Sequence, residues 1–240
     1  MSHTEFGGRA INGFDAVDGG QANDCNGHGT HVAGTVGGTT FGVAKAVTIV
    51  AVRVLNCDGV GTTVDVVAGV DWVTGNHAAN QPAVANMSLG GSPSPALDQA
   101  VKGSIQDGIT YAVAAGNGNI FGQAVNACNV SPARVPAAIT VSATNKSDAK
   151  PTWANKGKCV DWFAPGVDVK SAWASSNTAT AVLSGTSMST PHTTGVAALF
   201  LQTHPAAQPG TVRQALFART TKDIVTSSST PNNDLLFTNF

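Results

Sequence analysis

The chain has 240 residues, which is enough for one α/β domain with a large core. Charged residues make up 11% of the sequence and the net charge is -1, so the composition indicates no surface for nucleic acid or an anionic membrane. No apolar run approaches the roughly 18 residues that a membrane-spanning helix needs. The polar residues 1–5 are unlike a signal peptide.

Predicted strands and helices alternate along the chain. The expected strands are residues 9–14, 47–55, 83–89, 109–115, 136–143 and 160–163, with a hairpin-like pair at 167–173 and 178–184. The expected helices are residues 28–36, 62–78, 95–108, 188–203 and 209–219. This alternation predicts an α/β domain over residues 1–240 with three layers, in which helices cover both faces of a mostly parallel sheet.

One stretch of small residues carries a candidate nucleophile, Ser187. Gly185 permits a close approach of the backbone, and Pro191 is expected early in the helix, where its missing N–H costs little. Ser187 then lies at a helix start, where free N–H groups and the positive end of the helix dipole favour developing negative charge. A nucleophilic serine also needs a base, a group that orients the base, and donors for an oxyanion.

Two polar side chains that follow turns or strands are candidates for these roles. His28 begins a helix between two glycines, which leave room for a substrate beside a catalytic base. Asn117 directly follows a strand of small residues, where ligands bind in open α/β sheets, and its amide can donate to an oxyanion. Taken alone, His28 is more simply a structural histidine and Asn117 part of an Asn-Gly turn.

The spacing Cys25-x-x-His28-x-x-His31 also permits a zinc site. Tetrahedral structural zinc needs a fourth ligand, which this stretch does not supply. Zinc is therefore the less favoured interpretation of this stretch. His31 is also a weaker candidate for the catalytic base, because it is three residues after His28 and faces elsewhere by about 60° on a helix.

Three motifs in this order resemble the subtilisin-like serine proteases: residues 26–34, 115–117 and 185–192. Residues 42–44, 52–55, 87–91 and 163–166 are similar to the proteinase K branch and its aqualysin-type bacterial enzymes. The resemblance implies a subtilisin-like fold, with Ser187 as nucleophile, His28 as general base and Asn117 as oxyanion donor. It also implies that an extended peptide adds a strand along Ser88, Leu89, Gly90, Ala114, Ala115 and Gly116.

The orienting aspartate of this family has no counterpart in the chain. In the family it ends an apolar strand, in a motif that should precede Ser2, and no such motif occurs before His28. We therefore expect an N-terminally truncated domain that lacks its first core strand. If the chain is active, an acid or a water molecule is expected to meet the far nitrogen of His28, and Asp24 and Glu5 are the candidate acids. The place of the missing strand is expected to be filled by another segment, closed by its neighbours, or formerly filled by an upstream peptide.

Four cysteines allow three pairings, and four free thiols are the alternative. The aqualysin-type relatives imply the disulfides Cys25–Cys57 and Cys128–Cys159. Paired cysteines indicate an oxidising compartment, so the chain is expected to be secreted.

The resemblance further implies a structural Ca²⁺ site at Asp161 with the carbonyls of Pro136 and Ala138. Calcium takes hard oxygen ligands, and an uncompensated carboxylate in the apolar strand around Asp161 would be costly. The alternative is that Asp161 caps a turn or pairs with Arg134 or Lys158.

The favoured function is a serine endopeptidase with an incomplete triad and a reduced or rewired activity. The alternatives are a catalytically silent peptide-binding remnant and a serine hydrolase that acts mainly on esters. The expected partner is an extended peptide or protein substrate bound by a monomer, with no nucleic acid or membrane partner.

Overall fold

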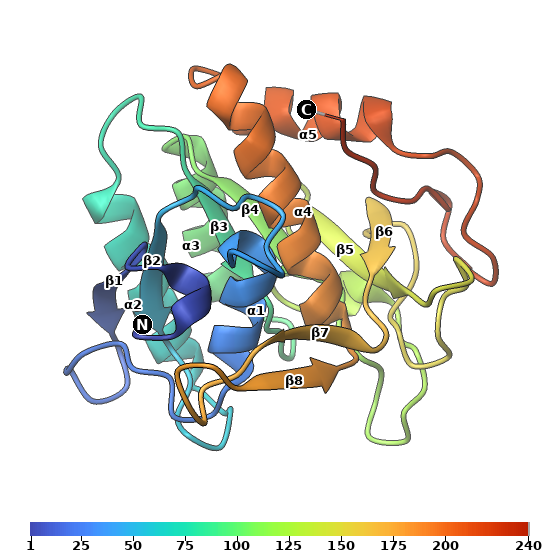
Figure 1. The fold of residues 1–240 in the computed structure, drawn as a ribbon. Coiled ribbons are helices and arrows are strands. Elements are labelled where there is room, and N and C mark those ends of the chain that lie inside the picture. Colours follow the sequence, from blue (N-terminus) through green and yellow to red (C-terminus); the bar gives the residue numbers. More distant parts are fainter. Residues whose placement is uncertain (240) are drawn as a thin grey trace.

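The sheet layer of the computed structural model, which describes residues 1–239, contains two groups of parallel strands (Figure 1). β1 (Ala10–Asp15) pairs with β2 (Ile49–Arg53). The other group runs in the order β3 (Val84–Met87), β4 (Thr110–Ala114), β5 (Ile139–Thr144) and β6 (Trp162–Pro165). β7 (Val169–Ala172) and β8 (Thr180–Leu183) form an antiparallel hairpin. Within residues 1–239, β2 and β3 are not paired, so the parallel strands form two separate sheets.

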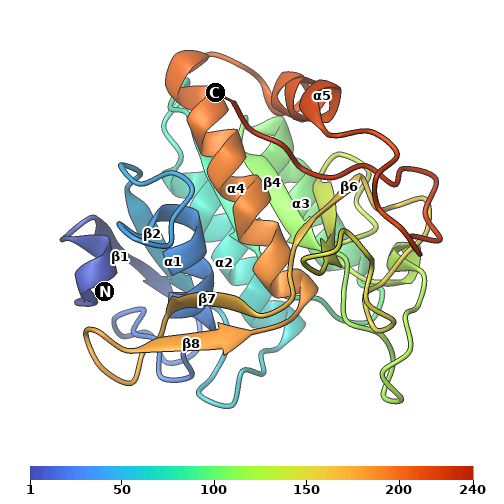
Figure 2. The same cartoon turned by 45° about the vertical axis from the view of Figure 1, so that its right-hand side comes forward.

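Helices cover both faces of this layer (Figures 1 and 2). α1 (His28–Gly37) and α4 (Thr186–Thr203) pack together on one face, while α2 (Thr63–Asn76) and α3 (Pro95–Gln106) pack together on the other. α5 (Pro209–Arg219) packs against α4, and two short 3-10 helices are η1 (Thr4–Phe6) and η2 (Ala127–Asn129). The three-layer, mostly parallel α/β fold agrees with the prediction.

α4 is the helix on which the sheet and the site both depend. Its Val196, Ala197 and Phe200 join the core with Ile139 of β5 and Trp162 of β6. The Trp162 indole also donates to the Thr193 hydroxyl of α4 over 3.0 Å, inside the core. Burial of this apolar face fixes the helix on the sheet, so the position of its N-terminus is fixed as well.

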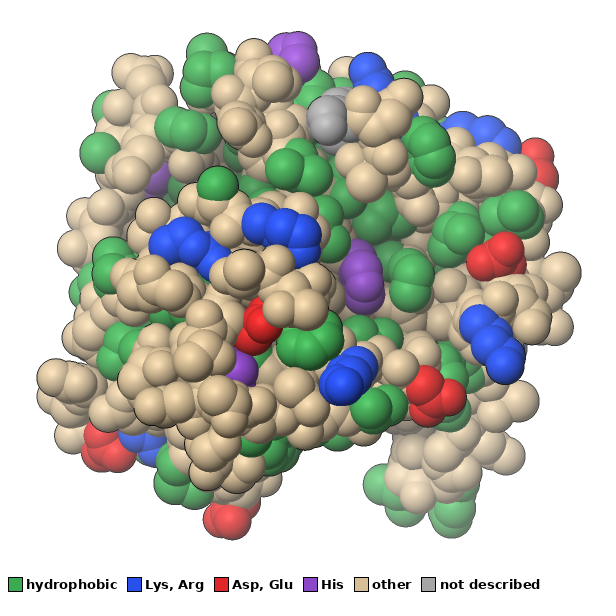
Figure 3. Space-filling view, viewed as in Figure 1, with side chains coloured by type: hydrophobic (Ala, Val, Ile, Leu, Met, Phe, Trp, Pro, Cys, Tyr) green, Lys and Arg blue, Asp and Glu red, His purple; other side chains and the backbone are tan. Residues whose placement is uncertain are grey.

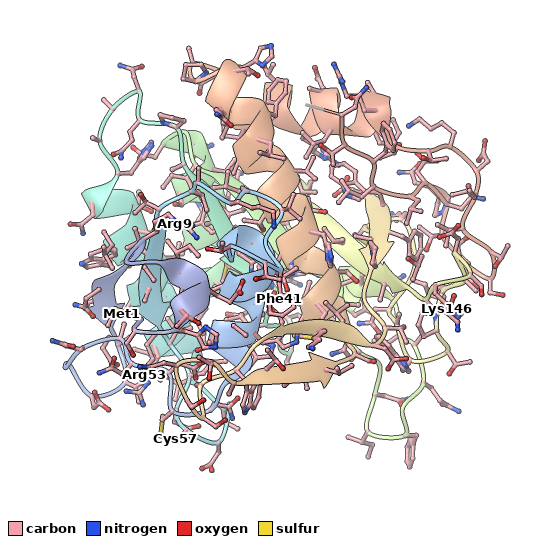
Figure 4. All side chains as sticks on the ribbon, in the orientation of Figure 1. Met1, Arg9, Phe41, Arg53, Cys57 and Lys146 are labelled. Carbon is pink, nitrogen blue, oxygen red and sulfur yellow. A yellow bond between two sulfur atoms is a disulfide. The ribbon has the colours of Figure 1, made fainter. Side chains whose placement is uncertain are left out.

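Both disulfides form the pairs that the resemblance implies, Cys25–Cys57 and Cys128–Cys159. The first joins the loop before α1 to the loop after β2, near Arg53 (Figure 4). Because Cys25 is oxidised, it is not a thiolate ligand for zinc. Nor does any cluster of three or more His, Cys, Asp or Glu side chains in residues 1–239 suit a metal ion.

On the face in Figure 3, Lys and Arg side chains are scattered among polar and hydrophobic ones. None of the helices in the described residues has the length and hydropathy that crossing a bilayer requires.

Candidate active site

Ser187 is the second residue of α4, which begins two residues earlier than predicted. The helix extends to Thr186 because the Thr186 N–H finds an acceptor in the side chain of Asn117, at 2.8 Å. The Ser187 N–H has no acceptor among residues 1–239, and the Ser187 hydroxyl donates to the Ser88 carbonyl at 3.1 Å. A free N–H and the positive end of α4 therefore lie beside the Ser187 oxygen.

Pro191 lies inside α4, not in its first turn as the sequence suggested. Because proline has no N–H, the Ser187 carbonyl, four residues earlier, receives no helical hydrogen bond. The Ser88 hydroxyl donates to this carbonyl at 2.7 Å, and the Asn86 amide donates to the Ser88 hydroxyl at 2.9 Å. The carboxyl end of β3 thus pairs the backbone group that Pro191 leaves open, and it holds Ser187 in place.

Asn117 follows β4 and turns its side-chain oxygen toward α4. Its Oδ1 accepts from the backbone N–H of Thr186 and, at 2.9 Å, from the Thr186 hydroxyl. The same hydroxyl accepts from the N–H of Gly116 at 3.1 Å. With two donors on Oδ1, the Asn117 amide has one orientation, and its Nδ2 donates to no residue that the structure describes. Asn117 Nδ2 and the Ser187 N–H are therefore two free donors at the start of α4.

A cleft of about 340 Å³ opens at the carboxyl ends of β3 and β4. Its lining comprises Leu89, Gly90, Gly91, Ser92, Pro93, Ala114, Gly116, Asn117, Gly118, Asn129, Val130, Asn155, Thr186 and Ser187. Of the predicted substrate-binding residues, Leu89, Gly90, Ala114 and Gly116 are in this lining. The other two are not: Ser88 is buried behind Ser187, and Ala115 is buried with its carbonyl accepting from Asn155.

His28 is the first residue of α1, and α1 packs against α4. Both helices begin at the same end of the molecule, the lower end in Figures 1 and 2. Burial lowers the pKa of the His28 imidazole, and the negative charge of Asp24 offsets only part of this. The ring therefore favours the neutral form that a general base needs. Within residues 1–239 it makes no hydrogen bond, and the Ser187 hydroxyl is directed to Ser88 instead.

Asp24 stabilises the start of α1 and does not orient His28. One oxygen accepts from the N–H groups of Asn26 and Gly27, and the other accepts from the N–H and the hydroxyl of Thr30. A carboxylate at this position satisfies the free donors of a helix start. Asp24, one of the two candidate acids, therefore does not meet the His28 ring in this structure.

Glu5 is also not the substitute partner. Its carboxylate accepts from the N–H groups of residues 40 and 41, in the loop that follows the opposite end of α1. No carboxylate in residues 1–239 is hydrogen-bonded to the His28 ring.

A tryptophan from the β7–β8 hairpin holds the start of α1 from the other side. Trp173 packs so closely that a Cβ at Gly27 would lie 2.5 Å from its ring, and Gly27 has a φ of 109°. Only glycine fits this position. His31 is fully buried, meets the edge of the Trp173 ring, and donates to the Val169 carbonyl at 3.0 Å. The buried His31 ring is thus held by the hairpin.

Asn155 is a residue of the site that no motif in the sequence singles out. Its buried side chain accepts from the N–H groups of Gly118 and Val125 and donates to the Ala115 carbonyl at 2.7 Å. Gly116 lies against it, since a Cβ at Gly116 would be 2.4 Å from the Asn155 amide nitrogen. Asn155 thus fixes the backbone on both sides of Asn117. No local pattern marks such a residue, because its partners are distant in the sequence.

We predict that Asn155→Ala destabilises the fold and loosens Asn117. The substitution leaves one buried and two part-buried backbone groups without partners, so the free energy of unfolding should fall by about 2 kcal/mol. The side-chain amide signal of Asn117 in a ¹H–¹⁵N spectrum should also shift and broaden. The matched control is Asn145→Ala, because Asn145 accepts only from the N–H groups of a surface turn. Equal stability and an unchanged Asn117 signal in the two variants would show that Asn155 does not position this wall.

Comparisons with known proteins point to one family. The model of the subtilase family, Peptidase_S8, matches residues 5–235. An extracellular serine proteinase of Thermus sp. (strain Rt41A) is 54% identical over 100% of this chain and 57% of its own length. The alkaline serine exoprotease A of Vibrio alginolyticus is 51% identical over 98% of this chain and 43% of its own length.

The fold also matches a solved structure closely. The crystal structure of a cold adapted subtilisin-like serine proteinase superposes with a TM-score of 0.94 at 50% identity, covering 99% of this chain and 84% of that one. The chain spans about half the length of the curated relatives it matches. On the extent and identity of these matches, the chain belongs to the subtilase family.

Proposed function

We propose that this chain is a serine endopeptidase that cleaves peptide bonds through an acyl-enzyme on Ser187. The observation that carries the proposal is the pair of free donors, Asn117 Nδ2 and the Ser187 N–H, at the start of α4 next to the Ser187 oxygen. Such donors stabilise the negative charge that forms on the carbonyl oxygen during attack. The names of the relatives, a serine proteinase and a serine exoprotease, support the same chemistry.

The reaction begins when the Ser187 hydroxyl leaves the Ser88 carbonyl and donates to His28. His28 takes the proton as Ser187 Oγ bonds to the substrate carbonyl carbon, and the resulting oxyanion accepts from Asn117 and from the Ser187 N–H. His28 then gives the proton to the leaving amine, which frees the first product. Water, deprotonated by His28, hydrolyses the acyl-enzyme and restores Ser187.

The substrate is proposed to be an extended peptide in the cleft between residues 89–93 and 114–118. Small side chains and glycines dominate both walls, so the backbone of a peptide can approach and pair with the wall backbone. A monomer supplies all of these groups. The two disulfides and the extracellular Thermus relative support secretion as the setting.

We further propose that His28 works without a carboxylate partner from residues 1–239, which reduces the rate. A triad aspartate fixes the tautomer of the histidine and stabilises its protonated form. In subtilisin, loss of the aspartate alone costs about 3 × 10⁴-fold in rate and leaves measurable catalysis. Hydrolysis of esters should suffer less than hydrolysis of amides, because their leaving groups need less help from an acid. A purely peptide-binding role is the alternative in which Ser187 does not react.

A structural Ca²⁺ at Asp161 is a separate proposal. The Asp161 carboxylate is buried beside β5 and β6, where one oxygen accepts from the Thr140 N–H at 2.8 Å. The other oxygen pairs with Arg213 of α5, not with Arg134 or Lys158. Burial raises the pKa of Asp161 although the Arg213 charge and these hydrogen bonds lower it, so a stronger counter-ion would stabilise the carboxylate.

The oxygen ligands proposed for this site are of the kind that suits a hard cation. Carboxylate and carbonyl oxygens are what calcium prefers, and Pro136 and Ala138 stand just before β5, on which Thr140 lies. The Arg213 side chain is 41% exposed, so it can turn into solvent when calcium takes its place. We propose that calcium and Arg213 are alternative counter-ions of Asp161.

For the catalytic proposal, we predict that the wild-type chain hydrolyses a nitrophenyl ester faster than a matched chromogenic peptide amide, and that both activities are lost in Ser187→Ala. Phenylmethanesulfonyl fluoride should label the wild type at Ser187 by mass spectrometry and should not label the variant. Ester turnover without amide turnover would indicate an esterase, and absence of labelling would indicate a binding protein. Wild-type rates in Ser187→Ala would rule out Ser187 as the nucleophile.

For the metal proposal, we predict that calcium raises the melting temperature relative to chelator, and that Asp161→Asn removes this difference. An ion at a hundredfold excess over its Kd stabilises the folded state by about 2.7 kcal/mol. Arg213→Gln should enlarge the calcium effect because it removes the competitor, whereas Lys102→Gln, an exposed charge on α3, should leave it unchanged. Identical melts of the wild type in calcium and in chelator would contradict the site.

A further inference from the structure

The loop after Asn117 presents two large apolar side chains to solvent. Ile120 is 94% exposed and Phe121 is 78% exposed, the highest fractions among the large hydrophobic residues that the structure describes. The loop projects from the lower right of the molecule in Figure 1 and again in Figure 2, and hydrophobic side chains are visible at that place in Figure 3. Two adjacent apolar side chains so fully in water are unfavourable unless another molecule covers them.

The loop is an ordered turn. The N–H of Asn119 donates to the Gln123 carbonyl at 2.9 Å, and the N–H of Gly122 donates back to the Asn119 carbonyl at 2.9 Å. The side chain of Asn119 accepts from the N–H groups of Phe121 and Gln123. These bonds hold the tip in one shape, so little further entropy is lost when it contacts a ligand.

The stem of the loop is part of the cleft. Gly118 lines the cleft and begins the turn, and a Cβ there would lie 2.6 Å from the Gln123 carbonyl oxygen. Asn155 binds the N–H groups of Gly118 and Val125 and so closes the loop at its base. The same side chain holds Ala115, so the apolar tip has a fixed position relative to Asn117.

We propose that Ile120 and Phe121 form a secondary contact for polypeptide substrates, where an apolar stretch of a protein chain that extends beyond the cleft packs on the tip. The inference rests on the proposed function, since the tip can contact the rest of a substrate polypeptide only if the cleft holds part of that substrate. The continuity of the loop with the cleft through Gly118 favours this occupant. A lipid surface is less favoured, because residues 118–133 contain no Lys or Arg to attract anionic headgroups.

Binding to a catalytically inactive chain tests the contact directly. In the Ser187→Ala background, we predict that Ile120→Ser with Phe121→Ser weakens binding of fluorescein-labelled, reduced and carboxymethylated α-lactalbumin by about tenfold. Binding of a tetrapeptide amide that fills only the cleft should be unchanged. The matched control is Ile11→Ser in the same background, since Ile11 is 47% exposed on β1, on the opposite side of the molecule (Figure 1).

The active chain gives a second measurement. The double variant should lower kcat/KM for casein about tenfold and leave that for the short chromogenic peptide within twofold of the wild type. Equal binding of the unfolded protein by the double variant and the Ile11→Ser control would overturn the proposal. The proposal would also be overturned if the double variant lost binding to phosphatidylcholine vesicles but kept its binding to unfolded protein, because that result would assign the tip to a lipid surface. The two proposals can also be told apart. If the wild type is inactive but the double loop variant still binds unfolded protein tenfold more weakly in the Ser187→Ala background, the catalytic proposal is refuted and the secondary contact is supported.

Discussion

The two hydrogen bonds from Thr186 to the Asn117 side-chain oxygen are the constraint on which the site depends. They join the end of β4 to the start of α4, two segments that are 69 positions apart in the sequence. The same bonds choose the orientation of the amide, because an oxygen held by two donors leaves Nδ2 free. The Thr186 hydroxyl also accepts a hydrogen bond from the Gly116 N–H, which links α4 to the residue before Asn117. Without these bonds the donors at Asn117 and at Ser187 would have no fixed relation to each other, and the charge that forms on a substrate oxygen would have to reorganise them.

Each of these two segments is in turn fixed from behind. Asn155 binds the backbone before and after Asn117, and the buried face of α4 packs against β5 and β6. Pro191 has no N–H, so the Ser187 carbonyl receives no hydrogen bond within the helix. This carbonyl accepts from the Ser88 hydroxyl instead. The start of α1 is built separately, from the Asp24 carboxylate and the Trp173 ring. His28 is therefore placed by its helix and not by a carboxylate on its ring.

The sequence predicted the parts of this arrangement that depend on short stretches of neighbouring residues. Ser187, His28 and Asn117 each follow a turn or strand end that a short motif reveals, and the alternation of strands and helices predicted the layers. The sequence did not reveal Asn155 or the orienting role of Thr186, because their partners become neighbours only in the folded chain. Asp24 was one of two candidate partners of His28, and it does not fill that role because its carboxylate accepts from four donors at the start of α1. The ion pair of Asp161 with Arg213 could not be predicted for the same reason, because the two residues are 52 positions apart in the sequence.

We propose that the start of α4 and a neutral His28 together make Ser187 a nucleophile. The rate of covalent labelling of Ser187 by phenylmethanesulfonyl fluoride, measured as a function of pH, tests this proposal. We expect a rate that rises through a midpoint below the ordinary histidine value of 6.5, because burial lowers the pKa of His28 and the neutral ring is the proposed base. We also expect His28→Ala to lose this dependence. Labelling at another serine, or the same midpoint in His28→Ala, would contradict it.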